Sequence, residues 1–172
     1  MPMIASPATT HFARLPLALG LALAAGCLTQ ANAQGVAQAT AHSADKPLVV
    51  RIAHGGPVSG PIAALGKDEE NGVRMAIDEL NARKLQIGGR PVQWKLEAGD
   101  DMGDPGQAAA LAQRFCDKKV AGVVGHLQSG TTLPAAKIYN DCNIPNITPA
   151  ATNTSITEAG YDASFRVIAN DK

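Results

Sequence analysis

Glycine and hydroxyl-bearing residues gather in three stretches, and each stretch follows a predicted strand. They cover residues 55–66, 126–131 and 149–153 and are rich in Gly, Ser and Thr rather than in charge. In open α/β sheets such loops converge beyond the carboxyl ends of the strands, where helix N-termini offer unpaired N–H groups. The pattern therefore predicts a crevice that holds a small carboxylate by hydrogen bonds, without an arginine.

A helix-capping role is the alternative for the same hydroxyls. Each of Ser129, Thr131 and Thr152 could be no more than a cap, because Ser and Thr side chains accept hydrogen bonds from the first free amides of a helix. Their predicted convergence on one edge of the sheet favours the binding interpretation.

Phosphate and metal motifs do not match. The segment GGPVSG lacks the G-x-G-x-x-G spacing, and five residues rather than the four of a phosphate loop separate Gly60 from Gly66. Asp100, Asp101 and Asp104 form an acidic loop, but its spacing is not that of an EF-hand, and cap and turn roles explain these residues better. The sequence therefore predicts no metal and no cofactor.

Nucleophilic catalysis finds little support. Ser59 and Ser129 lie outside a G-x-S-x-G elbow, and His54 and His126 end strands without a readable partner. For His126, a hydrogen-bonding role at the strand end is favoured. A hydrolase stays an alternative because triads assemble from distant residues, but the chain is predicted not to be an enzyme.

Short β-rich runs alternate with helical periods from Pro47 onward. The run VAGVVG is almost entirely apolar, as in a strand covered by helices on both faces. This alternation predicts an α/β fold with a doubly wound, mostly parallel sheet. The predicted strands cover 48–53, 92–97, 120–125, 144–148 and 165–168. Helices are predicted over 67–81 and 131–141, a further helix is predicted to start after Asp104, and a short helical turn is predicted at 155–158.

The composition limits the partners. The chain has 15 Lys and Arg residues against 15 Asp and Glu residues, whereas nucleic-acid binding needs a basic surplus. Aromatic residues make up only 3% of the chain, so aromatic stacking cannot dominate ligand binding. The charge balance therefore points to no polymeric partner.

The N-terminus has the pattern of a secretory signal. His11 and Arg14 precede an apolar run over 15–25, and the A-x-A-type sequence at 31–33 follows. The apolar run is too short to cross a bilayer. We therefore predict export to the periplasm, with residues 1–33 as signal peptide, 34–46 as flexible leader and 47–172 as the folded lobe.

A second processing signal overlaps the first. The run AAGC, ending at Cys27, resembles a lipobox, although Ala24 stands where leucine or a similar residue is usual. Lipid attachment at Cys27 is thus the alternative to cleavage after Ala33, and it would anchor the protein to a membrane.

The cysteine count agrees with export. If Cys27 leaves with the signal peptide, Cys116 and Cys142 remain as an even pair in an oxidising compartment. A disulfide between them would tie two neighbouring strand–helix units. Two buried thiols are the alternative, because sequence does not give the required geometry.

Four ordered segments resemble the Leu/Ile/Val-binding proteins of ABC importers. They are GPVSGPIAALGKDEENG, DDMGDPGQA, GHLQSGTTLPAAKIY and ITPAATNTSITEAGY, within residues 48–170. The resemblance implies the N-terminal lobe of a type I periplasmic-binding fold, in which two lobes close on an amino acid. It also implies an ABC permease of the inner membrane as partner, and we expect a monomer.

The resemblance also implies roles for individual residues. Ser129 resembles the serine that binds the α-carboxylate of the ligand, assisted by amides at the following helix start. Ala150 resembles the residue whose carbonyl accepts from the α-ammonium, and Thr152 resembles the one that contacts both groups. Leu65 stands where leucine-binding relatives can place a tyrosine against the ligand side chain. The implied ligand is a branched-chain or similar amino acid.

Two departures from the family pattern affect these expectations. Gly103 and Gln128 stand where relatives can have a disulfide. The family also has a second lobe that supplies the opposing wall of the site, and the 172 residues here leave no room for it. We therefore expect a truncated lobe with exposed sheet or helix surface.

A sensory or regulatory binding module of the same fold is the second functional hypothesis. Such a module presents ligand occupancy to a signalling partner rather than to a permease. A signal peptide followed directly by the lobe favours transport.

Overall fold

The computed structural model describes residues 46–172. The predicted signal peptide, Cys27 and all but the last residue of the predicted leader lie outside this range. No helix within it is long and apolar enough to cross a membrane.

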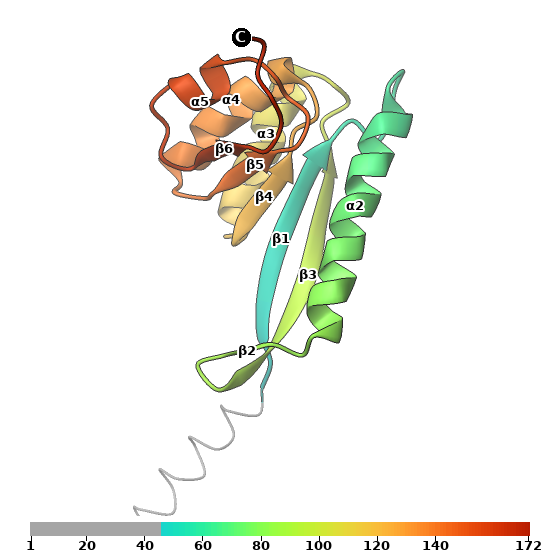
Figure 1. Cartoon of the computed structure of the whole chain (residues 1–172), viewed down its shortest axis with the longest axis vertical. Helices are drawn as coiled ribbons and strands as arrows, with labels where there is room; N and C mark the ends of the chain where they lie inside the picture. The colour runs from blue at the N-terminus through green and yellow to red at the C-terminus, as the bar shows by residue number, and fades with distance from the viewer. Residues whose placement is uncertain (1–45) are drawn as a thin grey trace, which may run out of the picture. The chain divides into compact units, whose positions relative to one another are not determined.

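One mostly parallel sheet organises residues 46–172 (Figure 1). Its strand order is β2-β3-β1-β4-β5-β6, and only the pairing of β2 with β3 is antiparallel. The predicted α/β class with a doubly wound sheet is therefore confirmed. The strands are β1 (Leu48–Gly56), β2 (Gln86–Ile87), β3 (Arg90–Asp100), β4 (Gly122–Gly125), β5 (Asn146–Thr148) and β6 (Ser164–Arg166).

Helices cover both faces of the sheet, but not evenly. Helix α2 packs on β1 and β3, whereas α3 and α4 pack against each other on the opposite face (Figure 1). The short α5 contacts α4 and β6. The helices are α2 (Ala63–Ala82), α3 (Pro105–Asp117), α4 (Ser129–Asp141) and α5 (Ser155–Glu158).

The main core lies between the sheet and the α3–α4 pair. Asp104 caps α3 by accepting a hydrogen bond from the Gln107 amide at 2.8 Å, and Pro105 opens the helix, as predicted. Burial of this apolar surface stabilises the layer by roughly 25 cal/mol per Å². The buried cluster consists of Ala53, Leu111, Ala112, Phe115, Val120, Val123, Ala135, Tyr139 and Ile144.

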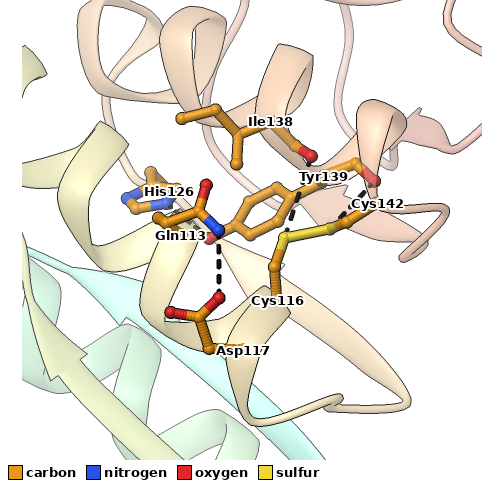
Figure 2. Close-up of a disulfide and its surroundings, with 7 residues drawn as sticks. All are labelled: Gln113, Cys116, Asp117, His126, Ile138, Tyr139 and Cys142. Atoms are coloured by element: carbon orange, nitrogen blue, oxygen red, sulfur yellow. Dashed lines mark hydrogen bonds between the residues drawn. A yellow bond between two sulfur atoms is a disulfide. The ribbon is translucent and has the colours of Figure 1, made fainter.

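A disulfide closes the ends of α3 and α4 (Figure 2). The Cys116 and Cys142 sulfurs are bonded at 2.02 Å, and their Cα atoms are 6.1 Å apart. Because Cys116 lies in the last turn of α3 and Cys142 directly follows α4, the bond fixes the two helices at their C-terminal ends.

Several predicted boundaries are wrong. The first helix begins at Ala63 rather than at Lys67, and the strand predicted over 92–97 extends over 90–100. The extension follows from pairing, because β3 stays in register with β1 up to Asp100 opposite Gly56. The helix predicted from Thr131 begins at Ser129, and the last three predicted strands are shorter than expected.

The sheet face beside α2 is incompletely covered. Val124, Ile147 and Phe165 stand in register on neighbouring strands, and Ile147 and Phe165 remain 38% and 49% exposed. An adjoining groove of about 510 Å³ is lined by Ile52 and Val124 of the sheet and by apolar residues of α2. The expected exposed sheet surface is thus present.

Candidate ligand-binding site

The predicted loops meet at the carboxyl edge of the sheet. Strands β1, β4 and β5 run parallel and end at Gly56, Gly125 and Thr148. Because β3 is also parallel to β1, the acidic loop after Asp100 lies on the same edge. This is the edge where open α/β sheets bind ligands.

Ser129 joins two of these loops. It is the first residue of α4, and its Oγ accepts a hydrogen bond from the Asn153 amide at 3.2 Å. The first α4 amides that bond back to the chain are those of Thr131 and Thr132, which both donate to the Gln128 carbonyl. Within residues 46–172, the Ser129 and Gly130 amides have no acceptor, so this helix start can receive an anion.

Ala150 and Thr152 lie in the loop that Ser129 contacts. The Ala150 amide donates inward to Thr148 Oγ1 at 3.4 Å, and within the described range the Ala150 carbonyl has no donor. The Thr152 carbonyl accepts a hydrogen bond from the Asp171 amide at 3.1 Å. Thr152 therefore has its half-buried hydroxyl to offer.

Leu65 belongs to a different element. The structure places it in the first turn of α2, where its side chain is 57% exposed. The hydrogen bond from Asn153 brings Ser129 to the loop of Ala150 and Thr152 but does not involve Leu65.

A fully buried polar cluster lies beneath the loops. His126 Nδ1 lies 2.6 Å from an Asp101 carboxylate oxygen, and Nε2 lies 3.0 Å from the Tyr139 hydroxyl. All three residues are buried, and burial raises the pKa of Tyr139 far above its ordinary value, with the Asp101 charge acting in the same direction. The predicted hydrogen-bonding role of His126 is confirmed.

The sequence did not identify the partners of His126. The sequence predicts cap and turn roles for Asp101, and Tyr139 falls inside a predicted helix. The available signal was a polar residue next to an apolar strand, which marks a buried group but does not name its partner.

The second buried histidine has an incomplete set of partners. His54 Nδ1 donates to the Val124 carbonyl at 3.1 Å, while Nε2 has no partner among residues 46–172. Burial lowers the pKa of His54, against the smaller opposing effect of that carbonyl.

Glu69 of α2 lies near His54. Its two carboxyl oxygens also lack partners within the described chain, and a Cβ placed on Gly56 would lie 3.0 Å from His54 Nε2 and 3.5 Å from a Glu69 oxygen. Burial, helped by the nearby Asp101 charge, raises the pKa of Glu69 to about 7.

The acidic loop is organised by its own amides. One Asp100 oxygen accepts hydrogen bonds from the Val58 and Met102 amides at 3.1 and 2.9 Å. Burial opposes ionisation of Asp100, but hydrogen bonds from Ser59, Met102 and Val58 outweigh it and lower the pKa. Asp100 therefore fixes the loop that follows β1.

Gly103 and Gln128 lie side by side. A Cβ placed on Gly103 would approach Gln128 Oε1 to 2.8 Å, and Gly103 has a φ of +69°. The two positions are therefore adjacent in this chain, and the glutamine side chain fills the space between them.

Residues 46–172 contain no group of three or more His, Cys, Asp or Glu side chains arranged to hold a metal ion. The His126–Asp101 pair resembles part of a triad, but Nε2 faces Tyr139 rather than a serine, and the pair is fully buried.

Comparison with known proteins identifies relatives. A family model described as periplasmic binding protein matches residues 49–172. The leucine-, isoleucine-, valine-, threonine-, and alanine-binding protein of Pseudomonas aeruginosa is 41% identical over 122 residues, which are 71% of this chain and 32% of that protein. The leucine-specific-binding protein of Salmonella typhimurium is 38% identical over the same shares of the two chains.

Solved structures agree with these relatives. The branched-chain amino acid transporter substrate-binding protein of Streptococcus pneumoniae, in complex with isoleucine, has a TM-score of 0.66 and 30% identity, over 72% of this chain and 35% of that one. An ABC transporter substrate-binding protein of Desulfitobacterium hafniense with bound leucine has a TM-score of 0.62 and 30% identity, over the same shares. This chain thus spans about a third of the length of its relatives.

The two curated relatives are amino-acid-binding proteins, and the two solved structures are transporter substrate-binding proteins with a bound amino acid. The solved structures have the type I periplasmic-binding fold. Because the family model covers most of the 172 residues, from residue 49 to residue 172, this chain belongs to the periplasmic binding protein family.

Proposed function

We propose that this chain binds a branched-chain or similar amino acid as the solute-binding component of an ABC importer. One observation carries the proposal. Ser129 opens α4 beside two amides that have no acceptor within residues 46–172, and its hydroxyl is tied to the loop that contains Ala150 and Thr152.

Each polar group of an amino acid finds a complementary group at this edge. The α-carboxylate can accept hydrogen bonds from the Ser129 hydroxyl and from the Ser129 and Gly130 amides, where the dipole of the 13-residue helix α4 favours negative charge. The α-ammonium can donate to the Ala150 carbonyl and to the Thr152 hydroxyl. Leu65 then offers an apolar contact to the ligand side chain in place of a tyrosine.

This chemistry is binding without reaction. The site offers hydrogen-bond donors, acceptors and one apolar side chain, and these groups hold a zwitterion without breaking a bond. The hydrolase alternative loses support because the His126 imidazole is occupied by Asp101 and Tyr139.

Export and delivery to a permease complete the proposal. The signal-like N-terminus directs the chain to the periplasm, by cleavage after Ala33 or by lipid attachment at Cys27. An oxidising compartment would maintain the Cys116–Cys142 disulfide. In that location a monomeric binding protein would meet an ABC permease of the inner membrane.

Thermal unfolding with ligands tests the proposal. We expect leucine, isoleucine, valine or alanine to raise the melting temperature, because a ligand that binds only the folded state stabilises it by about 2.7 kcal/mol at a hundred times Kd. Isovalerate and isoamylamine, which each lack one of the two polar groups, should produce no shift. A cooperative transition that no amino acid shifts would contradict the proposal.

A serine variant tests the carboxylate contact. Ser129→Ala should weaken binding by roughly 1 to 3 kcal/mol, because it removes a hydrogen bond to a charged group. Ser155→Ala is the matched control, since Ser155 is an exposed residue that opens the short helix α5. Equal affinity of Ser129→Ala and the wild-type chain would exclude Ser129 from the site.

A further inference from the structure

One chain of hydrogen bonds runs beneath all three loops of the proposed site. It begins at Asp101, whose amide donates to the Gly56 carbonyl at 3.1 Å and whose Oδ1 accepts from the Gly103 amide at 2.9 Å. Asp101 therefore fixes both the end of β1 and the acidic loop after β3.

His126 extends this series of hydrogen bonds to the second and third loops. Its ring bonds to Asp101 Oδ2, and its backbone carbonyl accepts from Thr148 Oγ1 at 2.8 Å. Thr132 Oγ1 lies 3.1 Å from the same carbonyl and 2.8 Å from the Gln128 carbonyl, so its single proton is shared between the two. Thr148 Oγ1 in turn accepts from the Ala151 amide at 3.0 Å. Through Asp101 the ring is linked to the acidic loop and to the end of β1. The carbonyl of the same residue is linked to the start of α4 and to the loop of Ala150.

The imidazole has no freedom to turn. Its Nδ1–H donates a hydrogen bond to the Asp101 carboxylate, so Nε2 of the neutral ring carries no proton and accepts a hydrogen bond from the Tyr139 hydroxyl. The raised pKa of Tyr139 keeps the hydroxyl protonated. In Figure 2 the Tyr139 ring extends from α4 toward His126. On the other side, a Cβ on Gly55 would lie 2.7 Å from the His126 ring, so the ring packs directly on the β1 backbone.

We propose that His126 is a positioning residue that couples the three binding loops into one rigid unit. It never touches the ligand, because it is fully buried. It sets the distance between the Ser129 amides and the Ala150 carbonyl, which are the groups that would hold the two ends of an amino acid. The effect on affinity rests on the proposed function, whereas the coupling of the loops does not.

Site-resolved amide hydrogen exchange of the ligand-free chain tests the coupling. In His126→Ala, protection of the Gly103 amide should fall about ten-fold or more relative to amides in the middle of α3, because the ring's hydrogen bond to the buried Asp101 carboxylate is lost. The backbone carbonyl of residue 126 remains in this variant, so the Ala151 amide loses protection only if the ring holds that carbonyl in place, as the coupling requires. His126→Asn should restore the Gly103 protection, since its amide can donate to Asp101 in place of Nδ1. Unchanged protection of the Ala151 amide in His126→Ala would overturn the inference.

His54 provides the matched control. It is equally buried, but its ring bonds to the Val124 carbonyl within β4 rather than to the side chain of a loop residue. His54→Ala should leave the Gly103 and Ala151 amides as protected as the rest of the chain. If the two histidine variants loosen the loops equally, the effect is general destabilisation and the inference fails.

A second variant keeps the test decisive if His126→Ala does not fold. Thr148→Val removes the hydroxyl between His126 and Ala151, and coupling predicts lower protection at distant Gly103 as well as at Ala151. Loss at Ala151 alone would overturn the inference. Ser164→Ala, which removes a buried side-chain hydrogen bond between β5 and β6, is the control and should affect neither amide.

Ligand titration separates this inference from the proposed function. If the loops are coupled but no amino acid binds the wild-type chain, the proposed function fails and the coupling stands. If amino acids bind and His126→Ala retains both affinity and loop protection, the proposed function stands and the coupling fails.

Discussion

At the scale of single residues, the surroundings of Glu69 disfavour its negative charge. Its carboxyl oxygens are buried without partners in residues 46–172, and its pKa is raised from 4.5 to about 7. A raised pKa means that the folded state binds the proton more tightly than the unfolded state. The resulting stability is complete below pH 4.5 and is lost as the pH rises through 7.

Glu69→Gln should therefore remove a pH-dependent loss of stability. The pKa difference of about 2.5 lowers the free energy of unfolding of the wild-type chain by at most roughly 3 kcal/mol above pH 7. The variant should thus be more stable than the wild-type chain at pH 8 and equally stable at pH 4. Urea unfolding at several pH values measures this. Asp68→Asn, an exposed neighbour on α2, is the control and should keep the wild-type profile. If Glu69→Gln shows the same dependence of stability on pH as the wild-type chain, the raised pKa of Glu69 is contradicted.

The sequence indicates candidate residues at the edge of the sheet more readily than the buried residues beneath them. Ser129, Ala150 and Thr152 stand in motifs whose order resembles a known family, so their positions could be carried over. The bond between His126 and Asp101 joins residues 25 apart, and nothing in a single sequence specifies such a pair. The engaged Thr152 carbonyl was likewise hidden, because its donor Asp171 comes from the end of the described chain.

At the scale of elements, the disulfide constrains α3 and α4. It joins residues separated by 26 positions, and closing a loop of that length stabilises the folded state by about 3 kcal/mol through the entropy of the unfolded chain. Reduction should therefore lower the urea midpoint without changing the native far-ultraviolet spectrum. The double variant Cys116→Ala and Cys142→Ala should show the same loss and no further response to reductant. Equal midpoints for the oxidised and reduced chains would rule out this contribution.

Periodicity identified the helices better than it located their starts. Helix α2 begins within a Gly- and Pro-rich run that resembles a loop, and Gly66 is required there because a Cβ would lie 2.3 Å from the Pro57 carbonyl oxygen. A glycine needed for close packing looks in sequence like a glycine needed for a turn. Strand β2 was missed because its two residues are too few to show alternation.

At the scale of the whole described chain, the uncovered sheet face exposes apolar side chains to solvent. Val124, Ile147 and Phe165 form an apolar row beside the groove along α2. We expect the chain to bind the dye ANS in its folded state, and the double variant Ile147→Thr and Phe165→Thr to reduce the fluorescence several-fold. Met75→Thr, on α2 and 64% exposed, is the control and should retain the signal. Undiminished fluorescence in the double variant would place the dye elsewhere.

The same face has a consequence for the fate of the protein in the cell. Strand β6 pairs only with β5 among the described strands, so an open strand edge adjoins the apolar row. Chaperones and proteases recognise such surfaces, and small changes in stability then alter how much protein survives. An open, apolar strand edge of this kind is also a surface on which another strand can pair.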